Sequence, residues 1–251
     1  MGTNPRINAK MTRYIPRLYV EQPLSAAANL LLNAGQSHYL TRVLRRQSGD
    51  AVLLFNGCDG EWAGSLTPPT SKNGVVGVTQ LQQTLAQPID PPLTLAFAPL
   101  KPAAMAVLIG QATELGVTAL QPLRMAHGLP EGLTQANKWH SYRVEAAESS
   151  GRCSLPTILP LKTLQQWLQE PEVEAILLWG DERLQAARLP DILRNTAPTG
   201  LLIGPEGGFS VEEFAQLQAT PWLLPCRLSD RVVRAETAAL IGLSGLTLHR
   251  P

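Results

Sequence analysis

The residues whose types and spacing best suit chemistry lie in two segments near the carboxyl end of the chain. In the first, an apolar run typical of a strand leads into the glycine loop Gly204-Pro205-Glu206-Gly207-Gly208. Ser210 and Glu213 follow with the S-x-x-E spacing of a capping box. Phe209 and Phe214 occupy the hydrophobic-staple positions around it. The glycines therefore lie in a turn between a predicted strand and a predicted helix, where parallel α/β sheets bind ligands and glycines allow close approach.

The composition of the glycine loop indicates which ligands it suits. Its spacing matches neither the G-x-G-x-x-G pattern of dinucleotide-binding folds nor the G-x-x-x-x-G-K-[ST] pattern of P-loops. The loop has no lysine or arginine, and Glu206, Glu212 and Glu213 would repel a phosphate group. A neutral or cationic ligand suits it better, and the sulfonium of S-adenosylmethionine is such a cation. A strand-to-helix turn without any ligand is the alternative interpretation.

The second segment, residues 228–240, leads into a predicted helix and carries charged residues close together. Arg231 and Arg234 are three residues apart, and Glu236 follows them. These three side chains are candidates for chemistry. The alternative is a solvated helix start with an internal ion pair.

Alternating strands and helices must position both segments. Helical stretches are predicted between and after apolar runs of strand length. The strands are predicted at 93–98, 118–122, 175–180, 200–203 and 222–226, and the helices at 102–115, 134–149, 182–194, 211–219 and 235–249. Gly116 stands where the left-handed residue that ends a helix belongs. Such alternation predicts a mostly parallel α/β sheet covered by helices.

A smaller domain of different character is predicted ahead of this region. Short β-type runs and turn signals surround a short predicted helix at 36–46. The runs are 17–20, 51–55, 61–66 and 75–78. With the Pro-rich run 87–92 as linker, the predicted domains are 1–86, a small β-barrel, and 93–251, the α/β domain. Residues 1–85 carry a net charge of +4 and the rest −3, within the chain's +1, which suggests that the first domain contacts phosphate.

Composition excludes several classes of protein. The 251 residues are 44% hydrophobic and 16% charged, as is typical of a globular protein. No run approaches the ~20 apolar residues of a membrane helix, and the polar residues 1–10 lack the apolar core of a secretion signal. Three cysteines and four histidines are scattered without a CxxC pair, so we expect no metal site and no disulfide. We therefore expect a cytoplasmic protein.

Together, the two carboxy-terminal segments resemble a known family. G-P-E-G-G-F-S at 204–210 and L-S-D-R-V-V-R-A-E-T-A at 228–238 are similar to the signature of the ribosomal RNA small-subunit uridine-N3 methyltransferase family, in the SPOUT superfamily. The resemblance extends over nearly the whole chain, with further matches at 16–19, 38–45, 49–50, 54–57, 101, 114–117, 122, 145–148, 150–152 and 156. The chain departs from the family pattern at Ser229, where glycine is usual, at Ser149, where glutamine is usual, and beside Arg124, where an E-R-S triplet is common.

The resemblance implies a fold, a reaction and a cofactor site. The expected fold is α/β, a SPOUT-type trefoil-knotted parallel sheet with helices on both faces, preceded by a small PUA-like β-barrel that binds RNA. The expected reaction is methylation of N3 of a specific uridine in 16S ribosomal RNA by S-adenosylmethionine, without a metal. Three carboxy-terminal loops would hold the cofactor, with expected contacts at Leu178, Gly180, Ile203, Gly204, Glu206, Gly207, Gly208, Leu228, Ser229, Arg231, Val232, Val233 and Thr237.

The same resemblance implies roles for charged residues and identifies partners. Arg231 or Arg234 would stabilise the negative charge on the uracil oxygens, and Glu236 would either accept the N3 proton or orient Arg234. RNA contacts are expected at Arg13, Arg17, His38, Arg42, Arg45, Arg46 and Arg124. The expected partners are 16S ribosomal RNA, naked or in the assembled small subunit, and a second copy of the chain in a homodimer.

Three alternatives belong to other classes of function. A related knotted enzyme would methylate a ribose 2′-hydroxyl. A non-catalytic RNA-binding protein could have kept the fold, and Ser229 in the expected cofactor loop gives this alternative some support. A nucleotide-dependent oxidoreductase is disfavoured because the phosphate-binding glycine pattern is missing.

Overall fold

The chain folds into two compact units, Met1–Pro88 and Ile89–Pro251, each with a hydrophobic core of its own. The computed structural model describes residues 14–26, 28–70, 74–130, 135–170, 176–181, 183 and 185–249. Within these ranges, no helix has both the length and the apolar character that a membrane span needs.

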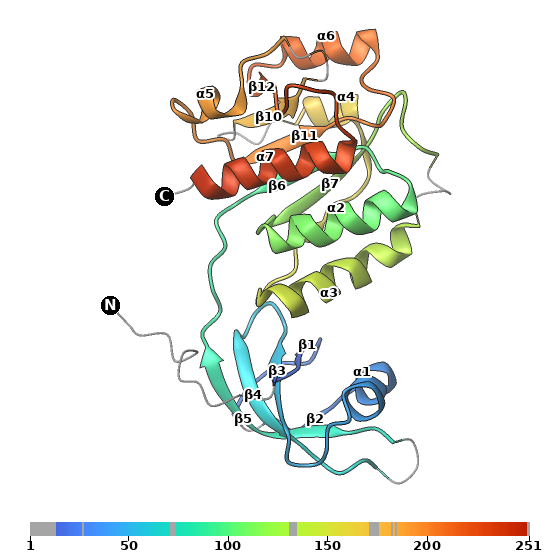
Figure 1. Ribbon diagram of the computed structural model, residues 1–251, viewed down its shortest axis with the longest axis vertical. Helices are drawn as coiled ribbons and strands as arrows, with labels where there is room; N and C mark the ends of the chain where they lie inside the picture. The colour runs from blue at the N-terminus through green and yellow to red at the C-terminus, as the bar shows by residue number, and fades with distance from the viewer. Residues whose placement is uncertain are drawn as a thin grey trace. The chain divides into compact units, whose positions relative to one another are not determined.

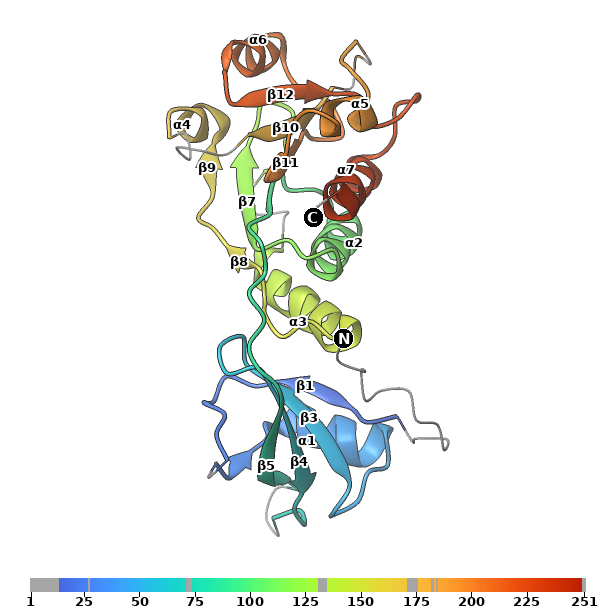
Figure 2. The same ribbon diagram turned by 90° about the vertical axis from the view of Figure 1, so that its left-hand side faces the viewer.

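The first unit is a curled five-stranded sheet (Figures 1 and 2). In spatial order its strands are β1 (Arg17–Tyr19), β3 (Ala51–Phe55), β4 (Glu61–Leu66), β5 (Gly77–Leu85) and β2 (Leu30–Leu31). β1 and β3 run parallel, and the other neighbouring strands run antiparallel. Val52 and Leu54 alternate along β3 into the core, where they join Leu18, Leu40 and Val78. The strands expected at 51–55 and 61–66 are confirmed, whereas the one expected at 75–78 continues to Leu85.

A short helical segment replaces the helix predicted at 36–46. α1 (Ala34–His38) begins at Asn33, whose side chain accepts a hydrogen bond from the Gln36 backbone N–H at 2.9 Å. The chain then continues as one π-helical turn, Tyr39–Val43, and Arg45 beyond it adopts a left-handed backbone with φ 53°. The sequence pattern therefore located the helical segment but not the change of winding within it.

The second unit is built on a parallel sheet, as predicted. Its strand order is β12-β10-β11-β6-β7-β8, with β9 pairing to β7, and every pair is parallel. The strands are β6 (Thr94–Phe97), β7 (Ala119–Arg124), β8 (Thr157–Ile158), β9 (Lys162–Thr163), β10 (Leu177–Gly180), β11 (Gly200–Ile203) and β12 (Leu223–Cys226). The two-residue strands β8 and β9 were not predicted, because two residues show no periodicity. Whether the chain forms the trefoil knot stays a prediction.

Helices cover both faces of this sheet (Figure 2), which confirms the predicted layers. Residues of α2 (Pro102–Glu114), α5 (Leu189–Leu193) and α7 (Ala235–His249) share one core cluster with Leu178. Residues of α4 (Leu164–Leu168) and α6 (Val211–Ala219) share another with Leu177 and Trp179. α3 (Trp139–Ser150) places Trp139 in the first of these clusters. Because successive side chains of a strand point to opposite faces, β10 contributes to both cores.

The helix predicted at 182–194 is confirmed only in part. Of the residues that the structure describes in this range, which leave out 182 and 184, Leu189–Leu193 is helical and those ahead of it are not. Ahead of it the Asp181 carboxylate accepts hydrogen bonds from the backbone N–H groups of Arg183, Gln185 and Ala186, at 2.9–3.1 Å. These bonds hold the segment as a turn, because an aspartate side chain offers the backbone an alternative to helical hydrogen bonds.

Candidate active site

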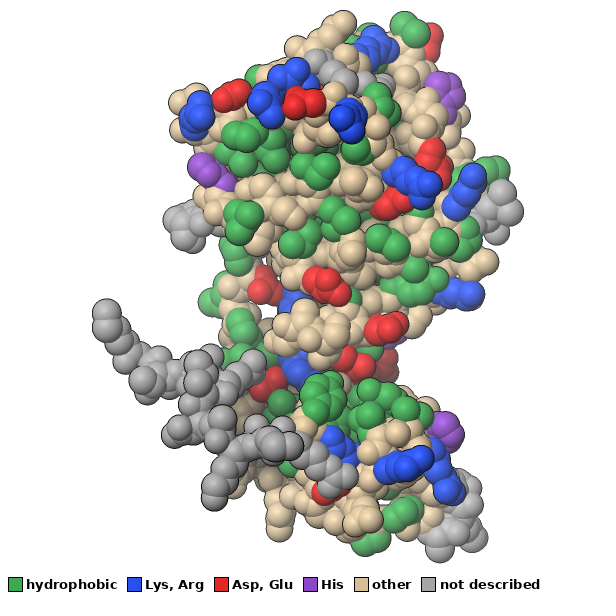
Figure 3. All heavy atoms as spheres, viewed as in Figure 1, with side chains coloured by type: hydrophobic (Ala, Val, Ile, Leu, Met, Phe, Trp, Pro, Cys, Tyr) green, Lys and Arg blue, Asp and Glu red, His purple; other side chains and the backbone are tan. Residues whose placement is uncertain are grey.

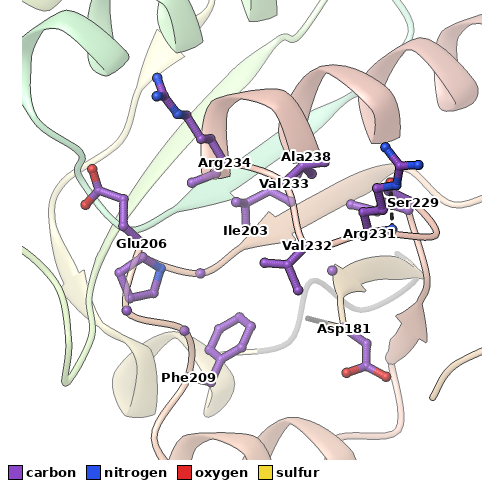
Figure 4. A pocket seen from close by; sticks show the side chains of 17 residues that line it. Asp181, Ile203, Glu206, Phe209, Ser229, Arg231, Val232, Val233, Arg234 and Ala238 are labelled. Carbon is purple, nitrogen blue, oxygen red and sulfur yellow. Dashed lines mark hydrogen bonds between the residues drawn. The ribbon is translucent and has the colours of Figure 1, made fainter. Parts of the chain in front are cut away.

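The carboxyl ends of three neighbouring strands meet at a cavity in the second unit. β10 lies between β12 and β11, and all three run parallel, so their ends share one edge of the sheet. A cavity of about 520 Å³ lies there (Figure 4). Its lining comes from the last residues of β10 and β11, the loops after the three strands and the start of α7: Gly180, Asp181, residues 203–209, Leu228, Ser229, residues 231–235 and Ala238. The two segments identified in the sequence therefore lie together.

The glycine loop after β11 packs too closely for side chains at two positions. A Cβ atom on Gly204 would lie 2.9 Å from the Phe209 ring. A Cβ atom on Gly207 would lie 2.9 Å from the Cβ atom of His127. Gly208 has a left-handed backbone with φ 74°, a conformation that residues with a side chain rarely adopt. The backbone of the loop, and not side chains at these positions, therefore borders the cavity.

The predicted start of α6 is confirmed. The Ser210 hydroxyl accepts the Glu213 backbone N–H at 3.2 Å, and the Glu213 carboxylate accepts the Ser210 N–H at 2.9 Å. Phe209 and Phe214 both pack edge-on against Trp179, with ring centroids 5.8 and 5.1 Å away. The loop is therefore anchored at the end where the helix begins.

A turn after β7 contacts the glycine loop from another side, and the sequence pattern did not identify it. The His127 ring nitrogen Nδ1 lies 3.1 Å from the Gly208 carbonyl oxygen. The Ala126 backbone N–H donates to the second carboxylate oxygen of Glu213 at 2.7 Å. The only available signal was that His127 follows the carboxyl end of a predicted strand.

The loop after β12 has fewer interactions. The Ser229 hydroxyl accepts the Arg231 backbone N–H at 3.2 Å (Figure 4), and the exposed ion pair Arg188–Asp230 measures 3.6 Å. Ser229 does not have a left-handed backbone, so serine fits this position without strain. Val232 is 73% exposed. In the view of Figure 4, Arg231 lies on the same side of the cavity as Ser229, and Arg234 lies on the other.

Most of the expected cofactor contacts line the cavity, and two do not. Leu178 is fully buried in the core beneath α7, because its side chain points into the sheet layer and not past the strand end. Thr237 is exposed on the first turn of α7 but does not line the cavity. Of the expected catalytic residues, Arg231 and Arg234 line the cavity and Glu236 does not.

The expected RNA contacts have different surroundings. His38, Arg42 and Arg45 are exposed and Arg46 is half-buried, and Figure 3 shows basic side chains beside a histidine over the α1 region. Arg124 is exposed at the end of β7. Arg13 lies outside the described residues.

The expected RNA contact at Arg17 is corrected by the structure, because this side chain is buried. It is 8% exposed, and its Nε atom donates to Glu61 at 2.7 Å. Its guanidinium lies 3.8 Å from the centroid of the Phe55 ring. The neighbouring Leu18 points into the hydrophobic core of the first unit, so Arg17 lies on the opposite face of β1, where it is buried against Glu61 and Phe55.

Charge beside the glycine loop favours a cation over a phosphate. Hydrogen bonds from its own backbone N–H and from the Ser210 hydroxyl hold the pKa of Glu212 below its ordinary value. The first turn of α6 therefore keeps its negative charge beside the glycine loop, where it would repel an anion. In the described part of the chain, no group of three His, Cys, Asp or Glu side chains is placed to hold a metal ion.

Comparison with known proteins places this site in a family. The family model of the RNA methyltransferase domain matches residues 87–247, and that of the RNA methyltransferase PUA domain matches residues 32–79. The ribosomal RNA small subunit methyltransferase E of Synechocystis is 33% identical over 237 residues, which are 91% of this chain and 76% of that protein. The protein of the same name from Rickettsia conorii is 28% identical over 249 residues, 92% of this chain and 95% of that protein.

Solved structures share the fold of both units. The ribosomal RNA small subunit methyltransferase E of Neisseria gonorrhoeae, bound to S-adenosyl methionine, has a TM-score of 0.80 at 24% identity, over 94% of this chain and 98% of that one. A Legionella pneumophila protein described as a methyltransferase, in complex with bound SAM, has a TM-score of 0.81 at 26% identity with the same coverage. The predicted fold class, a parallel α/β unit after a PUA-like unit, is confirmed. This chain belongs to the RNA methyltransferase family that includes the ribosomal RNA small subunit methyltransferase E proteins.

Proposed function

We propose that this protein transfers the methyl group of S-adenosylmethionine to N3 of a specific uridine in the 16S ribosomal RNA of the small subunit. The observation that carries the proposal is the cavity, which joins a glycine loop suited to a neutral or cationic ligand with two arginines suited to a developing anion. The names of the relatives support ribosomal RNA as the class of substrate.

The residues around the cavity fit S-adenosylmethionine. The volume of about 520 Å³ lies within the ~300–1,000 Å³ of small-molecule sites. Gly204 and Gly207 leave backbone N–H and C=O groups to bind an adenine, and Leu228 and Val232 offer apolar contacts. The exposed carboxylate of Glu206 attracts a positively charged group. When bound, this cofactor supplies an electrophilic methyl group, so the reaction needs an aligned nucleophile that has lost its proton.

The arginines act on the target base. Uridine N3 carries a weakly acidic proton. As this proton passes to solvent, negative charge spreads to the uracil oxygens, and N3 takes the methyl group from the sulfonium, which leaves as S-adenosylhomocysteine. Arg231 and Arg234 are exposed at the cavity, where a guanidinium stabilises such an anion. Glu236 does not line the cavity, and among the described residues it forms no ion pair with Arg234, so its expected role, as base or in orienting Arg234, stays a prediction.

RNA docking is assigned to the predicted domain 1–86, which the linker 87–92 joins to the methyltransferase domain 93–251. His38, Arg42 and Arg45 are exposed around the π-helical turn. Such turns, and left-handed residues such as Arg45, are frequent at functional sites. Replacing Arg42, Arg45 and Arg46 with glutamine should weaken RNA binding and lower its salt dependence, with S-adenosylmethionine binding unchanged. An unchanged RNA affinity would remove this domain from the proposal.

The direct test is methyl transfer from labelled S-adenosylmethionine to small ribosomal subunits that lack the modification, with mass spectrometry of the digested nucleosides. Label in N3-methyluridine is the expected result. Label on a ribose hydroxyl would instead identify a 2′-O-methyltransferase. No label, together with no binding of S-adenosylmethionine, would indicate a non-catalytic RNA-binding protein. The same assay on naked 16S RNA distinguishes the free RNA from the assembled subunit as substrate.

We also propose that the enzyme works in the cytoplasm as a homodimer, on the strength of the family resemblance. Light scattering after size-exclusion chromatography measures the mass in solution. A mass of one chain, in a preparation that transfers methyl groups, would contradict the dimer.

A further inference from the structure

Asp181 is a buried acidic residue at the cavity, outside the two segments whose sequence patterns indicate chemistry. It directly follows the last residue of β10, lines the cavity and is 5% exposed. In the described part of the chain, no lysine, arginine or histidine forms an ion pair with it. Burying a carboxylate destabilises the folded protein unless hydrogen bonds compensate the charge. The groups that donate hydrogen bonds to Asp181 therefore indicate its role.

Three backbone N–H groups provide this compensation. One carboxylate oxygen accepts from Arg183 at 2.9 Å, and the other accepts from Gln185 at 3.1 Å and Ala186 at 3.0 Å. In Figure 4 the carboxylate points away from Val232, which lies over the cavity. The side chain thus holds its own turn in place, and it does not direct its charge toward a ligand.

The turn fixed by Asp181 is bonded to the start of the loop after β12. The Asp181 N–H donates to the Cys226 carbonyl at 2.9 Å, and the Arg227 N–H donates to the Ala187 carbonyl at 2.8 Å. The Leu189 N–H donates back to the Arg227 carbonyl at 3.2 Å. Backbone hydrogen bonds therefore join both ends of the turn to residues 226–227, which directly precede the cavity-lining residues Leu228 and Ser229.

We propose that Asp181 is a positioning residue for the cofactor site. By holding the turn after β10, it sets where Arg227 lies and hence where the loop 228–234 begins beside the cavity. This inference rests on the proposed function, because it concerns the binding of S-adenosylmethionine. It assigns no contact between Asp181 and the substrate.

The test compares Asp181→Asn and Asp181→Ala with a matched control, Asp191→Asn. Asparagine keeps the shape of the side chain, but its amide nitrogen replaces one acceptor oxygen and faces a donor. Asp191 is an acidic residue ten positions further on, at the start of α5, and it pairs at the surface with Arg194. For each full-length protein one measures the dissociation constant of S-adenosylmethionine by calorimetry, KM and kcat for methyl transfer, and amide hydrogen exchange.

We expect Asp181→Asn to weaken S-adenosylmethionine binding about tenfold and to raise its KM similarly, with kcat at saturating cofactor changed less than about threefold. Amide exchange should accelerate in peptides covering 227–233 and stay unchanged in α2. Asp181→Ala should show a larger loss of binding, and Asp191→Asn none. A merely structural role would lower the melting temperature without this split between KM and kcat.

Two outcomes separate the inference from the proposed function. If the wild-type protein neither binds S-adenosylmethionine nor transfers methyl groups, the proposed function fails first. If the wild-type protein does both, while Asp181→Asn binds the cofactor normally and exchange accelerates only at 183–186, Asp181 does not position the site and the inference alone is overturned.

Discussion

The two loops that border the cavity from β11 and β12 differ in how firmly they are held. The glycine loop contacts His127 and Phe209 and is followed by a complete capping box. The loop 228–234 has one internal side-chain hydrogen bond, at Ser229, and one exposed ion pair, at Asp230. Its Val232 and both arginines are exposed. One loop is packed in place, and the other presents side chains to solvent.

The difference indicates that the two loops have different functions. A loop with many fixed contacts is preorganised and binds a rigid ligand without a cost of ordering. A loop with few buried contacts opens more easily and can adjust to a large partner such as RNA. We therefore expect changes in the glycine loop to act strongly on cofactor affinity. Changes at the start of the loop 228–234, at Leu228 and Ser229, should act more weakly on that affinity, and changes at its two arginines should act on turnover.

The largest expected effect is on turnover. Arg234→Ala should lower kcat about 100-fold, because a donor that stabilises developing charge is lost, while the affinity for S-adenosylmethionine stays unchanged. Single-turnover methylation and calorimetry measure the two quantities. Arg194→Ala, at an exposed ion pair on α5, is the control and should match the wild type. A wild-type rate for Arg234→Ala would show that this side chain takes no part in the reaction.

Gly204→Ala should weaken cofactor binding about tenfold or more. Its methyl group would lie within 3.0 Å of the Phe209 ring, which is packed against Trp179 and has little room to move. Gly110→Ala is the control, because a Cβ atom on Gly110 in α2 would meet nothing within 4 Å. That change should leave binding unaltered and raise the melting temperature slightly. Equal binding by both variants would mean that the glycine loop yields easily and is not preorganised.

Ser229→Ala should have a smaller effect, about two- to threefold on cofactor affinity. It removes one exposed hydrogen bond, which the Ser229 hydroxyl accepts from the Arg231 N–H, and such bonds contribute about 0.5 to 1 kcal/mol. Ser141→Ala on α3 is the matched control. A loss of cofactor affinity of more than tenfold would mean that the loop 228–234 is held as firmly as the glycine loop, and would contradict the difference between the two loops.

The smallest effect concerns Cys226, the last residue of β12. Burial raises the pKa of its thiol from 9.0 to about 12, so the folded protein keeps it protonated where an unfolded chain would ionise it. The stability from this neutral thiol is fully present below pH 9 and is lost as the pH rises toward 12. In the native protein at pH 9, iodoacetamide should label the exposed Cys58 and spare Cys226, as mass spectrometry would show. Rapid labelling of Cys226 would show that the base of the loop 228–234 opens readily.

Much of the second unit could be predicted from local patterns. Apolar runs of strand length located β6, β7, β10, β11 and β12, and the capping residues Ser210 and Glu213 fixed the start of α6 within one turn. Both signals work because neighbouring residues in the sequence are neighbours in the element that they form. Between 182 and 194 the local pattern of helix-forming residue types was misleading. There the Asp181 side chain accepts backbone hydrogen bonds from Arg183 and Ala186 and thereby favours a turn over a helix.

The sequence by itself determined the glycine loop, the charged segment after β12, the alternation of strands and helices, and the family resemblance, because contiguous residues encode all of these. Only the tertiary structure decided that Arg17 is buried against Glu61, 44 residues away, and that His127 contacts Gly208, 81 residues away. It also decided that Leu178 lies in the core while Gly180, two residues further along β10, lines the cavity. Such contacts depend on how distant segments pack, and no local pattern of residue types specifies that packing.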